Sequence, residues 1–344
     1  MCSLRRFTLT LVATTSIVAP CQINAQETAA TADTYQAVLI TGASSGIGLR
    51  TTEILSSAGT FVYAGARKQA DIDALNAMEN VEAVRLDVTK QDEIEAAVKQ
   101  IKAGGRGLYG VVNNAGVALT GPLVEIPESD LELTFNVNVA GPYRITKAFL
   151  PFLLESHGRV INIGSVSGIQ ANMMFGTYSM SKHAMEAYND ILALELQPFD
   201  IKVIGVTPGA FKSRITFNAI AAMEARGLSV ENSIYTQISW ERLRDNIKSG
   251  KGPQANLPEP DKVAYAIQDA LFSDTAKEHY MVVSSQDVAR LTITKLIEEI
   301  VRYNEGQEFE YDRDELVNML DEELSGERDA DAFRRFVPPS EIPE

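Results

Sequence analysis

Cysteine is almost absent from this chain of 344 residues, which contains Cys2 and Cys21 and no other. Because both lie in the first 21 residues, the sequence predicts neither a disulfide nor a cysteine metal site in the folded part. Histidine is nearly as rare, and His157, His183 and His279 are scattered without the spacing of metal ligands. We therefore expect no bound metal.

Positive charge is also scarce, since 31 lysines and arginines are set against 46 acidic residues, for a net charge of −15. Such a surface would repel a phosphate backbone, so we expect no nucleic-acid partner. The acidic excess is greatest near the C-terminus, at residues 308–315 and 321–323, where it indicates a solvated surface.

Long apolar runs are missing as well. Residues 7–19 follow Arg5 and Arg6, but they are too few and too rich in threonine to predict a membrane span. A small-residue site follows at 23–25, so residues 1–25 are predicted to be a cleaved signal peptide and residues 26–35 a linker. The protein would then be exported, to the periplasm or outside the cell. The alternatives are acylation of Cys21 and a mis-assigned start, and the latter would leave the protein in the cytoplasm.

From residue 36 to about 285, short apolar runs alternate with stretches whose apolar residues have helical spacing. The predicted strands are 37–40, 60–64, 81–86, 110–112, 159–163 and 201–206, and the predicted helices include 47–57, 94–101 and 130–154. This alternation predicts an α/β domain over 36–285, a Rossmann-type doubly wound parallel sheet with helices on both faces. Ligands of such sheets bind at the carboxyl ends of the strands.

Two further helical patterns, at 288–303 and 312–324, lie beyond the predicted domain. Residues 286–344 are therefore predicted to form an acidic helical extension. The acidic residues Asp312 and Glu315 stand where they would complement the positive dipole at the start of the second helix.

The first predicted strand runs directly into Thr41-Gly42-Ala43-Ser44-Ser45-Gly46-Ile47-Gly48. Glycines let the backbone approach a pyrophosphate, and the N-terminus of the following helix offers unpaired N–H groups. The glycine spacing is G-x-x-x-G-x-G, not the G-x-G-x-x-G of the commonest dinucleotide fold. The alternative is a tight turn without a ligand. We predict that a dinucleotide contacts Gly42, Ser44, Ser45, Gly46, Ile47 and Gly48.

The loop resembles the T-G-x-x-x-G-I-G loop of the short-chain dehydrogenase/reductase family. Further elements resemble that family in the same order: Leu86-Asp87-Val88, Asn113-Asn114-Ala115-Gly116 and Pro208-Gly209. The match covers about residues 37–285. It implies a nicotinamide dinucleotide cofactor, held in part by Asp87, Val88, Asn113, Asn114, Ala115, Gly116, Pro208 and Gly209. For Asn113 the alternative is that it only holds neighbouring strands together.

The choice between NAD and NADP depends on the end of the second predicted strand, where an acidic residue would repel the 2′-phosphate of NADP. Ala66 stands where members of the family that use NAD tend to carry aspartate, and Arg67 follows it. We therefore expect NADP rather than NAD, with Arg67 as a ligand. The alternative is that Arg67 and Lys68 only begin the next helix in solvent. Ser45 precedes Gly46, so the basic residue common there in NADP-dependent members is missing.

Tyr178 and Lys182 have a four-residue spacing that places both side chains on one face of a helix. The pKa of tyrosine is about 10 in water, and a neighbouring cation stabilises its phenolate. Lys182 would therefore let Tyr178 exchange a proton with a substrate. Ser165 has the family's spacing to the tyrosine, and it would hydrogen-bond the substrate oxygen. The resemblance further implies that Tyr178 and Lys182 contact the cofactor and that Asn138, rather than Asn136, maintains a proton relay.

The segment after Pro208-Gly209 is expected to cover the substrate. It is rich in large apolar residues, which predict a lid over a hydrophobic molecule, and the alternative is ordinary core packing. These residues are Phe211, Ile215, Phe217, Ile220, Met223, Tyr235, Ile238 and Trp240, and Met173, Met174 and Phe175 would line the same site.

Residues 61–67, 148–152 and 195–203 resemble the members of the family that act on steroids and retinoids. We therefore expect an NADP-dependent oxidoreductase that interconverts a secondary alcohol and a ketone (or aldehyde) on a hydrophobic small molecule. The family also suggests a homodimer or homotetramer, without a stable membrane span. The alternatives are a catalytically inactive dinucleotide-binding sensor or scaffold, and an enzyme of the same fold acting on sugars or ketoacyl substrates.

Overall fold

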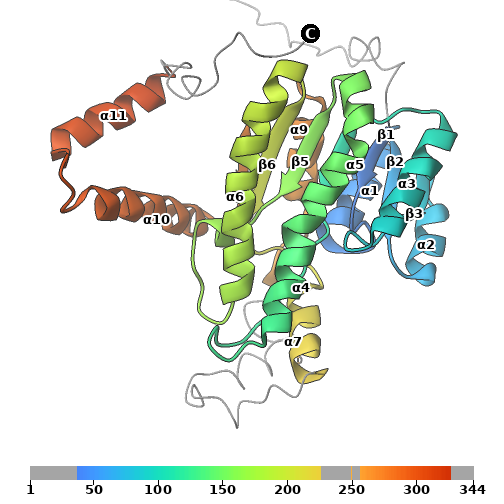
Figure 1. The fold of residues 1–344 in the computed structure, drawn as a ribbon, viewed down its shortest axis with the longest axis horizontal. Helices are drawn as coiled ribbons and strands as arrows, with labels where there is room; N and C mark the ends of the chain where they lie inside the picture. Colours follow the sequence, from blue (N-terminus) through green and yellow to red (C-terminus); the bar gives the residue numbers. More distant parts are fainter. Residues whose placement is uncertain (1–36, 226–248, 250–255, 327–344) are drawn as a thin grey trace, which may run out of the picture.

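The computed structural model describes residues 37–225, 249 and 256–326. Its centre is one parallel sheet in the order β3-β2-β1-β4-β5-β6-β7 (Figure 1). The strands are β1 (Ala37–Ile40), β2 (Phe61–Ala66), β3 (Val81–Arg85), β4 (Gly110–Asn113), β5 (Arg159–Ile163), β6 (Lys202–Pro208) and β7 (His279–Val282). The chain starts in the middle of the sheet, so the strand order reverses beside β1. This is the doubly wound Rossmann-type topology expected from the sequence.

Helices cover both faces of the sheet, as predicted (Figure 1). On one face lie α1 (Gly46–Ser57), α2 (Gln69–Asn76) and α9 (Asp261–Phe272). On the other lie α3 (Gln91–Gly104), α5 (Ala140–Ser156) and α6 (Gly176–Leu196). Successive side chains of a strand point to opposite faces, so Val38 and Ile40 enter one core while Leu39 enters the other.

The helical stretch predicted over 130–154 is two helices, so that expectation was wrong. Helix α4 (Glu128–Asn138) ends where α5 begins, and Val139 between them has φ −116° and ψ −60°. Because α4 ends at Asn138, this residue lies at the corner between the two helices, where its side chain can contact other elements. The hydrophobic spacing continues across the corner, which is why the pattern did not reveal it.

Two short helical turns and one further helix complete the domain: η1 (Val166–Gly168), η2 (Gln197–Phe199) and α7 (Ile215–Ala225). The predicted signal peptide at 1–25 and the predicted linker at 26–35 lie outside the described residues. None of the described helices has both the length and the apolar character needed to cross a membrane.

Beyond β7 the chain forms α10 (Gln286–Asn304) and α11 (Arg313–Ser325), where the two helical patterns were predicted. Both helices project to one side of the sheet (Figure 1). Thr292, the buried residue of α10, accepts a 2.7 Å hydrogen bond from the Gln170 amide and so ties the helix to the domain. Asp312 begins α11 with a capping box that includes Glu315.

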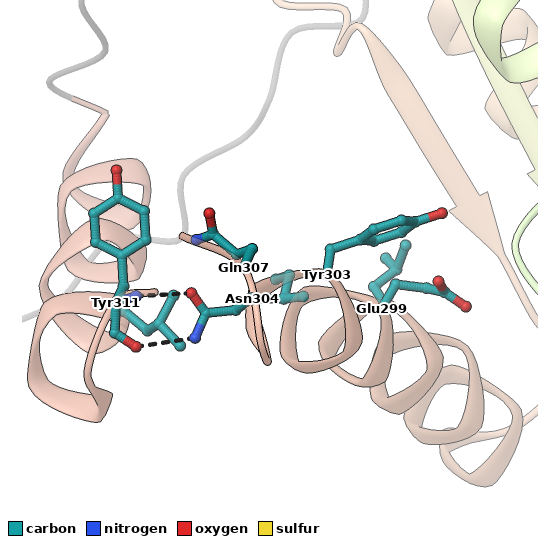
Figure 2. Close-up of a pocket in the computed structure, with 8 residues that line it drawn as sticks. Glu299, Tyr303, Asn304, Gln307 and Tyr311 are labelled. Carbon is teal, nitrogen blue, oxygen red and sulfur yellow. Dashed lines mark hydrogen bonds between the residues drawn. The ribbon is translucent and has the colours of Figure 1, made fainter. Parts of the chain in front are cut away.

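The two C-terminal helices are joined by a loop that the Asn304 side chain closes. Its amide group donates to the Tyr311 carbonyl and accepts from the Tyr311 N–H, each at 2.9 Å (Figure 2). Beside this loop is an open, mainly apolar hollow of about 670 Å³. It is lined by Leu296, Glu299, Ile300, Tyr303, Asn304, Gln307, Tyr311 and Leu316.

Candidate active site

The glycine loop after β1 packs against the loop after β4. Gly42 and Gly46 have φ of 66° and 56°, in the left-handed region that favours glycine. A Cβ at Gly42 would lie 2.9 Å from Ala115 Cα, and one at Gly48 would lie 2.5 Å from the Gly42 carbonyl oxygen. Side chains at these positions would push the two loops apart, so the backbone path requires glycine.

Thr41 and Asn114 hold the two loops together. The Thr41 hydroxyl accepts hydrogen bonds of 3.0 Å from the N–H groups of both Asn114 and Ala115. The Asn114 amide donates to the carbonyls of Thr41 and Gly42 at 2.9 and 3.1 Å. Asn114 therefore supports the glycine loop through its side chain, and Ala115 and Gly116 follow along the same edge. Their contacts with a cofactor remain predictions.

The start of α1 is suited to a diphosphate. Its N-cap residue Ser45 makes no capping hydrogen bond with its side chain, and its first turn contains no acidic residue. The first N–H groups of the helix, beginning at Gly46 and Ile47, therefore remain available to a negatively charged group. A Cβ at Gly46 would lie 3.2 Å from the Ser213 side chain. Ser213 thus adjoins the loop, although the sequence analysis did not single it out.

Arg67 lies at the carboxyl end of β2, where the 2′-phosphate of NADP would lie in this fold. Its side chain is 65% exposed and 3.7 Å from the Asp87 carboxylate. Burial alone would raise the pKa of Asp87, but hydrogen bonds from Thr89 and the charge of Arg67 lower it overall. Asp87 is therefore a stable anion that restrains Arg67, and the neighbouring Val88 is buried.

Arg85 adds a second guanidinium at this end of the sheet, and the sequence analysis missed it. It donates to the Arg67 carbonyl at 2.7 Å and to the Gln69 side chain at 2.6 Å. The register of β2 and β3 sets Arg85 opposite Ala66. The signal would have been this parallel pairing, because it places the last residue of β3 beside Ala66 and next to Arg67, which the sequence predicts to select the cofactor.

Ser165 and Tyr178 are brought together from different elements. Ser165 follows β5, and its Oγ accepts a 3.1 Å hydrogen bond from the Ser167 N–H. Tyr178 lies in the first turn of α6. Burial raises the pKa of the Tyr178 hydroxyl, and the adjoining Ser165 side chain lowers it in part. Two hydroxyl groups thus adjoin at the carboxyl end of the sheet, where a substrate oxygen can contact both.

Lys182 follows Tyr178 by one turn of α6, as the spacing predicted. Its Nζ donates a 2.6 Å hydrogen bond to the Ile163 carbonyl and lies 5.7 Å from the centre of the Tyr178 ring. Burial lowers the pKa of Lys182 to about 8, while the charge of Glu186 acts in the opposite direction. A lysine cation is therefore fixed close to the tyrosine.

Asn138 connects the end of α4 to the loop after β4 and to α6. Its side chain accepts from the Val117 N–H and donates to the Val117 carbonyl, each at 2.8 Å, and it donates to Ser181 at 2.9 Å. Ser181 precedes Lys182 on α6. Asn136, the competing residue, instead accepts a 2.8 Å hydrogen bond from Arg144. The geometry thus links Asn138, and not Asn136, to the helix that carries the tyrosine and lysine.

Asn113 is the last residue of β4, and the Pro208-Gly209 turn begins at the last residue of β6. The buried Asn113 amide donates to Thr146 at 3.1 Å and to Asn162 at 2.8 Å, so it joins β4 to α5 and β5. Pro208 ends β6, and the Gly209 N–H donates to the Val282 carbonyl of β7 at 2.8 Å. The structure shows a strand-holding contact for Asn113, and its contact with a cofactor remains a prediction.

Part of the apolar segment expected to form a lid belongs to the core. Phe211 is buried in the cluster formed with α1 and α9, which is the alternative of ordinary core packing. Phe217 on α7 is instead exposed. The side chains of Ile220 and Met223, and the whole of Tyr235, Ile238 and Trp240, lie outside the described residues.

Exposed apolar side chains lie near the start of α6. The loop after β4 meets the loop before α6, where the Gly121 N–H donates to the Met174 carbonyl at 2.9 Å. A Cβ at Gly176 would lie 2.9 Å from the Leu123 side chain. Leu123 therefore packs against the start of α6, two residues before Tyr178. Leu123 and Met173 are both exposed there.

Known proteins resemble this chain in sequence and in fold. The family model described as short chain dehydrogenase matches residues 36–224. The 3-ketodihydrosphingosine reductase of Bacteroides thetaiotaomicron is 38% identical over 187 residues, which span 53% of this chain and 66% of that protein. The chain thus matches slightly less than two thirds of this relative's length.

Solved structures extend the similarity over more of the fold. A short-chain dehydrogenase from Streptomyces avermitilis has a TM-score of 0.65 and 28% identity, covering 80% of this chain and 96% of its own. A variant actinorhodin polyketide ketoreductase, solved with NADPH, has a TM-score of 0.61 and 26% identity, covering 74% and 97%. Because the family model spans more than half of the 344 residues, the chain belongs to the short-chain dehydrogenase family.

Proposed function

We propose that this protein is an NADP-dependent oxidoreductase that interconverts a secondary alcohol and a ketone (or aldehyde) on a hydrophobic small molecule. The observation that carries the proposal is that the Ser165 side chain adjoins the buried Tyr178 hydroxyl, with the Lys182 Nζ 5.7 Å from the centre of the tyrosine ring. These groups lie at the carboxyl end of the sheet that also carries the glycine loop, where ligands of such folds bind.

In this proposal Tyr178 carries the proton. Its phenolate accepts the hydroxyl proton during oxidation, and its hydroxyl donates a proton to the substrate oxygen during reduction. Ser165 hydrogen-bonds the same oxygen and orients it. Because burial raises the pKa of Tyr178, the nearby positive charge of Lys182 is needed to favour the phenolate. A nicotinamide dinucleotide, when bound, supplies or accepts the hydride.

The glycine loop and the start of α1 fit the diphosphate of such a cofactor, since glycine is required there and the helix N–H groups are available. Lys182 would bind the nicotinamide ribose in addition to its role beside Tyr178. Asn138 holds α6 and the loop after β4 in place and would maintain the proton relay. Asn114 would hold the loop shape on which the diphosphate rests.

The preference for NADP rests on Arg67 and Arg85, two guanidinium groups at the end of β2 and β3. A guanidinium binds a phosphate in a bidentate manner, so the exposed Arg67 would pair with the 2′-phosphate. No carboxylate stands at position 66, where an aspartate would repel that phosphate. The related ketoreductase was solved with NADPH, which is consistent with this preference.

The preference for a hydrophobic substrate is supported by the exposed apolar side chains near Tyr178. Leu123 contacts the start of α6 at Gly176, and Met173 precedes that helix by three residues. Covering these exposed residues with an apolar molecule removes apolar surface from water, which lowers the free energy of the complex. The named reductase from Bacteroides thetaiotaomicron is consistent with a ketone as the oxidised substrate.

Turnover of NADPH with a panel of compounds tests the proposal. We expect oxidation of NADPH with apolar ketones or aldehydes, and little with sugars or ketoacyl thioesters. Tyr178→Phe should reduce turnover by about a thousandfold and leave NADPH binding intact. Tyr188→Phe, on the same helix, should retain activity. A Tyr178→Phe variant with wild-type turnover would disprove the role of Tyr178, and a wild-type protein that binds NADPH but turns over none of the panel would favour the sensor.

A further inference from the structure

A second cluster of polar side chains adjoins Lys182. Glu186 lies one turn further along α6, Thr207 is on β6, and His279 begins β7. The Thr207 hydroxyl lies 3.5 Å from Glu186 Oε1 and 2.7 Å from His279 Nε2. His279 Nδ1 lies 3.8 Å from Glu186 Oε2. The three side chains thus form a closed set of contacts between the catalytic helix and two strands.

The backbone leaves room for the Glu186 carboxylate. A Cβ at Gly164 would lie 2.8 Å from Glu186 Oε1, and a Cβ at Gly168 would lie 3.0 Å from the same oxygen. Gly164 and Gly168 flank Ser165 in the segment between β5 and α6. The carboxylate therefore packs directly beneath the segment that carries one proposed catalytic hydroxyl, one helical turn away from the proposed catalytic lysine.

Charged and titratable groups face Glu186 from each side. They are Lys182 and Asp190 from α6 and His279 from β7, with the Thr207 hydroxyl from β6. Burial raises the pKa of Glu186, whereas His279 and Lys182 lower it. For Lys182, burial lowers the pKa and the charge of Glu186 raises it. Lys182 Nζ binds the Ile163 carbonyl and the Glu186 carboxylate packs beside the next residue, Gly164, so the two opposite charges are near each other and each favours the other's charged form.

The hydrogen-bonding groups around Glu186 also favour its charged form. A neutral imidazole carries one N–H, and a hydroxyl carries one proton. If His279 is protonated on Nδ1, that N–H faces Glu186 and Nε2 accepts from Thr207. If it is protonated on Nε2, that N–H faces Thr207, whose hydroxyl then donates to Glu186. In the first tautomer the Nδ1 N–H lies 3.8 Å from the carboxylate, beyond hydrogen-bond distance, and in the second the Thr207 hydroxyl donates to the carboxylate at 3.5 Å.

We propose that Glu186 is a positioning residue for Lys182, which keeps the lysine charged, and that Thr207 and His279 hold the carboxylate in place. This inference rests on the proposed function, because it assigns Glu186 a role through the lysine that supports Tyr178. The effect is electrostatic, so it predicts a change in the pH dependence of the reaction rather than a uniform loss of activity.

Replacing the charge without the shape tests the proposal. In Glu186→Gln the lysine loses its counter-charge, so the alkaline limb of kcat/KM should move to lower pH by about one unit. Activity should be close to wild type at pH 6 and fall behind it by up to about tenfold above pH 8, because one pKa unit is a tenfold change in protonation. NADPH affinity, measured by fluorescence titration, should weaken over the same pH range if Lys182 binds the ribose.

Two further variants separate charge from shape. Glu186→Asp keeps the charge and shortens the side chain, so it should restore most of the alkaline limb that Glu186→Gln loses. Glu195→Gln makes the same chemical change at an exposed position of α6 and should leave the profile unchanged. Thermal unfolding should confirm that all variants are folded.

The outcomes distinguish this inference from the proposed function. If Tyr178→Phe abolishes turnover and Glu186→Gln has the wild-type pH profile, the role of Glu186 is overturned and the proposed function stands. A Glu186→Gln variant that loses activity equally at every pH, with Glu186→Asp no better, would indicate a structural residue and would also overturn the inference. Turnover that survives Tyr178→Phe would remove the basis of both.

Discussion

The Nζ atom of Lys182 lies 5.7 Å from the centre of the Tyr178 ring and is fixed there by a 2.6 Å hydrogen bond to the Ile163 carbonyl. The bond holds the ammonium to the end of β5, and the helix holds the tyrosine. A buried cation is costly, and here burial lowers its pKa from 10.5 to about 8. The protein therefore maintains this charge at the expense of stability, which leads to the first prediction.

Replacement of Lys182 by Met should abolish turnover and yet stabilise the fold at pH 7. A lysine whose folded pKa is depressed destabilises the protein below that pKa, and the penalty disappears as the pH rises from about 8 to the unfolded value of 10.5. After allowance for the lost hydrogen bond, Lys182→Met should gain on the order of 2 kcal/mol at pH 7. Urea unfolding at several pH values measures this gain.

The sign of the pH effect makes the stability prediction specific. The advantage of Lys182→Met over the wild type should shrink by about 1 kcal/mol between pH 7 and pH 9, since the wild-type lysine is losing its proton. Lys147→Met, an exposed lysine on α5, serves as the comparison and should show no such pH dependence. An advantage that grows with pH would contradict the depressed pKa of Lys182.

Replacement of Arg67 by Ala should weaken NADPH binding by about tenfold or more and leave NADH binding little changed, because a charge-assisted hydrogen bond to phosphate is worth about 1.5–3 kcal/mol. Arg85→Ala should act in the same direction, since Arg85 also supports the Arg67 carbonyl. Fluorescence titration with both cofactors gives the ratio. Lys68→Ala, next along the chain, is the control, and an unchanged NADPH to NADH ratio in Arg67→Ala would refute the assignment.

The sequence predicted the architecture well because its signals are local. Each strand except β7 is a short apolar run, and the i, i+4 spacing of Tyr178 and Lys182 is preserved in α6. By contrast, β7 is short and begins with the polar His279, and it is only partly buried at the edge of the sheet. Such a strand has too little apolar pattern to be recognised.

Residues whose roles depend on pairing between strands could not be found from the sequence. Arg85 reaches the cofactor end because β3 pairs with β2 in a particular register. Glu186 lies 3.8 Å from His279 because α6 packs against β6 and β6 pairs with β7, although the two residues are far apart in the chain. Phe211 belongs to the apolar segment that predicted a lid, but the turn after β6 directs its side chain into the core.

Replacement of Asn138 by Asp should destabilise the protein at pH 7, and the lost stability should return as the pH falls. The Asn138 amide donates to the Val117 carbonyl at 2.8 Å, whereas an ionised carboxylate at that point would face this oxygen without a proton. The cost should be about 3 kcal/mol at pH 7 and should decrease at acidic pH, where a protonated carboxyl group can donate again. Thermal melts compared with the wild type at pH 5 and pH 7 measure the difference.

Asn136→Asp provides the matched control for that experiment. Asn136 accepts a hydrogen bond from Arg144, so an aspartate there would keep the acceptor and add a favourable charge. We expect Asn136→Asp to be tolerated at pH 7. Equal losses for the two variants would show that Asn138 has no special place in the link between the loop after β4 and α6.

Replacement of Gly48 by Ala should remove dinucleotide binding without unfolding the domain. Its Cβ would lie 2.5 Å from the Gly42 carbonyl oxygen, a backbone atom, so the glycine loop must move. Overpacking of this kind costs about 1–3 kcal/mol, and the displaced loop would no longer match a diphosphate. We expect NADPH affinity to fall by at least about tenfold.

Gly59→Ala is the comparison: Gly59 has a φ of 91° with no atom within 4 Å of its Cβ position, beyond the far end of α1. It should lose some stability through backbone strain but bind NADPH normally. If Gly48→Ala binds NADPH as tightly as Gly59→Ala does, the cofactor does not approach this loop and the proposed position of the diphosphate is wrong.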